Sequence, residues 1–114
     1  MKDLDKLRER FLRDPVPRRL GWLAATFGRL PSSARKSTDP NTVYDLQDEA
    51  KLLIEWTEAD TEPETAVVLV QMQTMITLWQ RAWTGASQNP QQRLILSIQA
   101  KNWSDIAIHH SGLV

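Results

Sequence analysis

Cysteine is absent from this 114-residue chain, and glycine is scarce, with 4 residues. Without a thiol the protein can form no disulfide framework, no cysteine-ligated zinc or iron–sulfur site and no thiolate nucleophile. The glycines are too few for a loop that cradles phosphates, and the spacings of nucleotide-binding motifs do not occur. We therefore expect no cofactor and no catalytic residues, and hence a protein that is not an enzyme.

Histidine is limited to two adjacent residues, His109 and His110. Adjacent helical residues point about 100° apart, so this pair is poorly placed to chelate a metal ion. The Glu-x-x-His spacing of di-iron bundles is also missing. We expect both imidazoles to interact with the carbonyl end of a helix, and we expect no metal site.

Long apolar runs are missing as well. The longest stretch without a charged residue, residues 65–80, includes glutamine and threonine. It is shorter than the ~20 apolar residues that a membrane-spanning helix needs. Residues 1–14 carry charges throughout, which is unlike the apolar segment of a secretory signal. These features predict a cytoplasmic protein without a membrane partner.

Strand-like alternation of polar and apolar residues does not occur, and the apolar residues recur at helical spacing instead. Hydrophobic residues make up 41% and charged residues 25%, with a formal net charge of +0, which is typical of a soluble domain. The sequence therefore predicts an all-α fold. We expect one domain over residues 1–114, a bundle of about five helices in which two short helices precede three longer ones.

Breaks in the helical pattern divide this domain into three parts. Residues 1–30 are predicted to form a basic helical pair, interrupted where two prolines follow Asp14. Residues 31–39 are rich in hydroxyl groups and are predicted to form a polar loop. Residues 40–110 are predicted to form the main three-helix bundle. Its helices are expected over residues 40–59, 62–84 and 90–110.

The strongest helical periodicity lies in residues 62–84. Its main apolar stripe consists of Val68, Met72, Met75, Ile76, Trp79, Ala82 and Trp83. Further apolar residues widen this stripe, namely Val67, Leu69, Val70 and Leu78. A helix that is hydrophobic on several sides is usually buried on several sides. We therefore predict that it is the central helix of the bundle.

Charge is segregated along the chain although its sum is zero. Residues 1–36 contain 10 Lys/Arg and 4 Asp/Glu, for a net charge of +6. Residues 37–64 contain 1 Lys and 9 Asp/Glu, for a net charge of −8, and residues 65–114 contain 3 Lys/Arg and 1 Asp. Three explanations are open: a solvated surface on which basic and acidic helices pack together, an electrostatic register between subunits, or a basic patch for an anionic partner.

Five tryptophans are many for a chain of this length. Trp22 and Trp56 fall outside the main apolar stripes of their predicted helices, and Leu52 lies one turn from Trp56. Because tryptophan is enriched at protein interfaces, these three residues are the candidate protein interface. The first functional hypothesis is a small interaction or self-assembling module, most simply a homodimer, with another protein partner as a further possibility.

Two alternatives belong to other functional classes. A nucleic-acid-associated regulator would use a basic patch formed by Arg8, Arg10, Arg13, Arg18, Arg19, Arg29, Arg35 and Lys36. A carrier of a small apolar ligand would use an apolar pocket formed by Met72, Met75, Trp79 and Trp83.

Overall fold

The computed structural model describes residues 3–36 and 40–112, and within these ranges it contains five α-helices and no strand. The all-α prediction is therefore confirmed. The helices are α1 (Leu4–Leu12), α2 (Val16–Arg35), α3 (Pro40–Glu58), α4 (Pro63–Ala86) and α5 (Pro90–Ser111).

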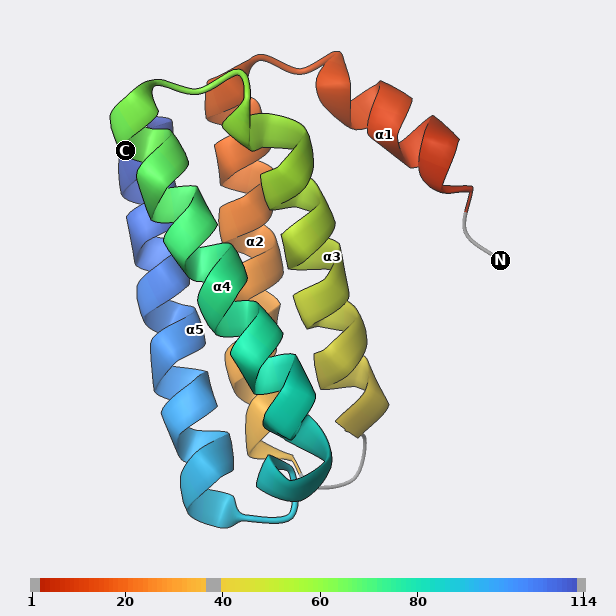
Figure 1. The fold of residues 1–114 in the computed structure, drawn as a ribbon, viewed down its shortest axis with the longest axis vertical. Helices are drawn as coiled ribbons and strands as arrows, with labels where there is room; N and C mark the ends of the chain where they lie inside the picture. Colours follow the sequence, from red (N-terminus) through yellow and green to blue (C-terminus); the bar gives the residue numbers. More distant parts are fainter. Residues whose placement is uncertain (1–2, 37–39, 113–114) are drawn as a thin grey trace.

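Helices α2 to α5 form an up-and-down bundle, and α1 lies outside it, near the end where α2 begins (Figure 1). Helix α2 packs most extensively against α5 and then against α3, whereas α4 packs more closely against α3 than against α5. The seam between α4 and α5 is therefore the least tightly closed junction between neighbouring helices of the bundle. None of the helices in the described ranges has the length and apolar content needed to cross a membrane.

Helix α2 differs from the prediction in length. The sequence predicts a short helix ending at residue 30 and a polar loop over residues 31–39, but α2 has 20 residues and continues through Pro31 to Arg35. Residues 37–39 of the predicted loop lie outside the described residues. Proline inside a helix removes one backbone hydrogen bond and costs about 3 kcal/mol. Leu30 and Ala34 lie on either side of Pro31 and are fully buried, so packing against the bundle offsets that cost. With this length α2 joins the three predicted helices of residues 40–110 as a fourth bundle member.

Helix α4 differs from the prediction in position. Its buried residues, among them Leu69, Met72 and Ile76, lie on one side, as expected for a bundle helix. Val67 and Leu78 are exposed to 57% and 52%, so the helix predicted to be central presents apolar side chains to solvent. The reason is geometric, because a helix in a four-helix bundle contacts its neighbours on one side and keeps the other side outward.

Gln47 differs from the other fully buried polar side chains that the structure describes in that both of its polar atoms lack a hydrogen-bond partner. Gln47 on α3 is fully buried, one turn from Val43 and Ala50. Among the described residues neither its amide oxygen nor its amide nitrogen has a hydrogen-bond partner. A buried polar group without a partner destabilises the native state by about 1–3 kcal/mol.

We predict that Gln47→Leu stabilises the protein, because leucine fills a similar volume and has no polar atom to desolvate. The melting temperature should rise by about 2–8 °C in thermal unfolding followed by circular dichroism. Gln80→Leu is the control, since the Gln80 amide accepts from Lys51 and donates to Asp48 and its loss should not stabilise. A lower melting temperature for Gln47→Leu would show that the amide is satisfied inside the bundle.

Candidate interaction surface

The three residues of the predicted protein interface lie on the side of the bundle that faces α1. The ring of Phe11, which is fully buried, lies 5.1 Å from the ring of Trp22 and 6.0 Å from that of Trp56, measured between centroids. Leu52 lies one turn before Trp56 on α3 and lines a cavity together with Leu4 and Leu7 of α1. The apolar surplus that the sequence shows on α2 and α3 is therefore partly covered by the chain's own first helix.

Arg19 holds the turn between α1 and α2 in place. Its Nε donates to the carbonyl oxygen of Asp14 at 2.8 Å, and one terminal nitrogen donates to that of Leu12 at 3.3 Å. The other terminal nitrogen forms an ion pair of 2.8 Å with Asp60 in the turn after α3. The Arg19 side chain is only 10% exposed, whereas that of Asp60 is 53% exposed, so solvent reaches the ion pair from the Asp60 side. Arg19 thus has a structural role and is not available to a partner.

The other residues of the predicted basic patch do not all lie together. Arg10, Arg13 and Arg29 line one cleft, whereas Arg35 and Lys36 lie at the C-terminal end of α2. Arg18 begins α2, whereas Arg35 and Lys36 end it about 25 Å away at 1.5 Å per residue. Arg29 forms an ion pair of 2.7 Å with Glu49, and Arg35 donates to Ser97 at 3.0 Å. The eight predicted residues therefore do not form one continuous basic surface.

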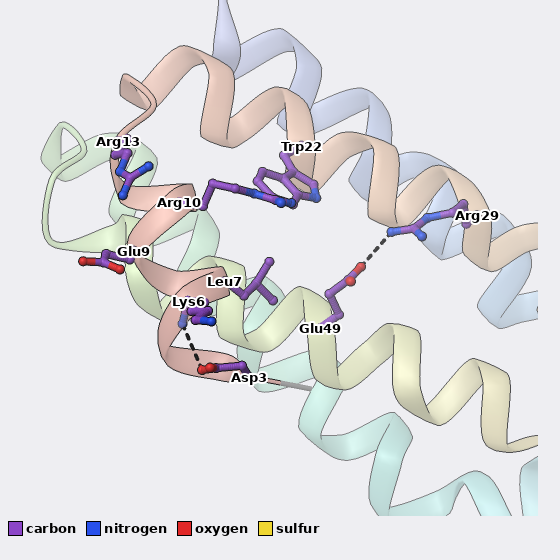
Figure 2. Close-up of a pocket in the computed structure, with 9 residues that line it drawn as sticks. All are labelled: Asp3, Lys6, Leu7, Glu9, Arg10, Arg13, Trp22, Arg29 and Glu49. Carbon is purple, nitrogen blue, oxygen red and sulfur yellow. Dashed lines mark hydrogen bonds and ion pairs between the residues drawn. The ribbon is translucent and has the colours of Figure 1, made fainter. Parts of the chain in front are cut away.

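A cleft of about 780 Å³ separates α1 from α2 and α3 (Figure 2). The Arg10 side chain extends alongside Trp22 in it, with the guanidinium carbon 6.0 Å from the ring centroid. The lining residues carry both signs of charge and consist of Asp3, Lys6, Leu7, Glu9, Arg10, Arg13, Trp22, Arg29 and Glu49. Because basic and acidic groups alternate around it, the cleft does not present the single-sign field that concentrates an anionic ligand.

The four residues of the predicted apolar pocket do not line one cavity, although the rings of Trp79 and Trp83 lie 6.4 Å apart between centroids. Met72 and Trp83 are each only 3% exposed and belong to the core, where the Trp83 indole donates to the carbonyl oxygen of Pro40 at 3.0 Å. Met75 is 38% exposed, and it lines a surface groove together with the half-buried Trp79. The Met and Trp residues thus divide between packing and surface.

This groove lies between α4 and α5, has a volume of about 390 Å³, and is lined by Met75, Leu78, Trp79, Ala82, Gln92, Ile95 and Gln99. None of these seven residues carries a charge. Two side-chain hydrogen bonds join the helices: the Trp79 indole donates to Gln99 at 2.6 Å, and Thr65 bonds His110 at 3.0 Å. The groove therefore has a largely apolar lining, and the Trp79–Gln99 hydrogen bond joins its two walls.

Sequence reasoning missed Leu78, Ala82 and Ile95 as candidate site residues, although a signal was present. Met75, Leu78 and Ala82 follow the spacing i, i+3, i+7, which places them on one face of a helix. Helical periodicity identifies apolar faces, but it does not tell which of two such faces on one helix is buried.

Metal-ligating side chains do not gather within the described ranges, where no group of three or more was found. The His110 imidazole forms a hydrogen bond with Thr65, so it links the C-terminal end of α5 to the start of α4 in addition to lying at its own helix terminus. No protein-family model, curated protein or solved structure matches this chain. Functional inference therefore rests on the surface itself.

We predict that Phe11→Ala releases α1 while the bundle stays folded. A helix of 9 residues is not stable alone, and truncating a buried phenylalanine costs about 3–5 kcal/mol. Amide hydrogen exchange in residues 4–12 should accelerate at least ~10-fold, with much smaller changes in α2 to α5. Leu4→Ala is the control, because Leu4 is 46% exposed. Unchanged exchange in α1 would show that Phe11 does not anchor it.

Proposed function

We propose that this protein acts through protein–protein contact and that it self-associates as a homodimer. The observation that carries the proposal is the distribution of exposed apolar side chains. Seven of the nine large hydrophobic residues that are exposed within the described ranges lie on α4 and α5. These seven residues are Val67, Val70, Met75, Leu78, Leu94, Ile95 and Ile98. Single exposed apolar residues are common on monomers, whereas a large contiguous patch marks an interaction site.

The distribution of charge supports the same function. Residues 65–80 of α4 and residues 94–100 of α5 contain no charged side chain. Acidic and basic residues are concentrated instead on α1, on α3 and at the ends of α2. Surfaces that bind other proteins are depleted of charged residues at their centre, because each buried charge has to be desolvated or paired.

The predicted interface of Trp22, Leu52 and Trp56 supports self-association less directly. Trp22 and Trp56 already pack against Phe11 of the same chain, so a partner at this site would have to displace α1 or add to it. The hypothesis that these residues form the dimer contact stays a prediction, and substitution of Trp56 tests it separately.

Self-association predicts a particle of twice 13.1 kDa in native mass spectrometry and in light scattering after gel filtration. The dimer should dissociate on dilution and should persist in ~1 M sodium chloride, because apolar contacts are not screened by salt. An interface held by basic and acidic segments would instead weaken as salt is added. A monomer at ~0.1 mM would refute the proposal, since interfaces of standard size bind more tightly than this.

A further inference from the structure

The groove between α4 and α5 has apolar side chains on both of its walls. On α4, Met75 and Leu78 lie one turn apart and Ala82 follows one turn later, all lining the groove. On α5, Ile95 lines the opposite wall, and Ile98, the most exposed large hydrophobic residue described at 60%, follows one turn later. The two stripes flank the loosely packed seam between the helices, so side chains from another molecule can enter between them.

The groove also has the chemistry of a surface that matches itself. Its polar residues are the amides Gln92 and Gln99, and an amide carries both hydrogen-bond donors and acceptors. An amide of one copy can therefore donate to, or accept from, a polar group of the other copy. At the groove itself a second copy brings only apolar and neutral side chains, whereas a charged partner would have to bury its charges there without a counter-ion.

The size of the face fits a stable dimer. Helix α4 has 24 residues and α5 has 22, so each is about 33–36 Å long at 1.5 Å per residue. Two adjacent helices, each about 10 Å wide, project roughly 700 Å² toward solvent. The two helices also carry the exposed charged residues Glu64, Arg81, Lys101 and Asp105, which would have to lie at the rim of a contact, where interfaces are polar. A standard interface buries about 800 Å² of accessible surface per partner, and accessible area exceeds projected area because side chains protrude.

We infer that the α4–α5 face is the dimer interface and that it binds the same face of a second copy of this chain. This inference rests on the proposed self-association and adds the surface and the symmetry to it. In a two-fold arrangement the same patch serves both subunits, so each of Leu78 and Ile95 is buried twice per dimer. One substitution on this face therefore disturbs the interface at two symmetric places.

Ile95 on α5 and Leu4 on α1 provide a matched pair of variants. Both are exposed to a similar degree, 49% and 46%, but only Ile95 lines the groove between α4 and α5. Ile95→Glu places a charge in the interface and should raise the dimer dissociation constant at least ~100-fold. Leu4→Glu adds the same charge outside the α4–α5 face and should change the constant by no more than ~3-fold. Dissociation constants are measured by sedimentation velocity over a concentration series.

Leu78→Glu is a second variant that carries the same expectation from α4, because Leu78 is 52% exposed and lines the groove. Circular dichroism on each variant shows that the monomer stays helical, which exposed positions permit. A wild-type monomer would overturn the proposed self-association together with this inference. A wild-type dimer that withstands Ile95→Glu and Leu78→Glu, but dissociates with Trp56→Ala, would overturn this inference alone and assign the contact to α2 and α3.

Discussion

Each helix of a four-helix bundle can bury only one side, and the two-sided hydrophobicity of α4 cannot be satisfied inside a bundle of this size. Leu69, Met72 and Ile76 take the inward positions of α4. Met75 and Leu78 are consequently left on the outside, next to a seam with α5 that is more open than the other junctions. The shape of the bundle thus leaves an apolar face without an intramolecular partner.

The opposite situation holds on α2 and α3, where the chain provides its own cover. Phe11 lies against Trp22 and Trp56, and Arg19 ties the end of α1 to Asp60. The segregation of charge has a corresponding explanation within one chain. Basic α2 lies beside acidic α3, and their closest ion pair joins Arg29 to Glu49 at 2.7 Å. Exposed pairs of this kind add little stability, but they favour one arrangement of helices over others.

Together these features give the bundle two unlike surfaces. The side near α1 is charged with both signs and is partly covered by the first helix, whereas the groove between α4 and α5 is lined by apolar and neutral side chains. Self-association through this groove would leave the charged side free for solvent. It would also keep the like charges of two subunits apart, because the basic and acidic residues of α1 and α3 lie away from the contact.

The amino-acid sequence by itself determined the helices and most of their ends, because hydrophobic periodicity and proline positions act within a few residues of the chain. The five helices follow from these local patterns, and Asn89 caps α5 by accepting from the backbone of Gln91 and Gln92. Only the tertiary structure decided which apolar face of α4 is buried and that α2 continues through Pro31. It also decided that Trp22 and Trp56 pack against Phe11. These outcomes depend on competition among helix faces for the same interior, and that competition takes place between residues far apart in the sequence.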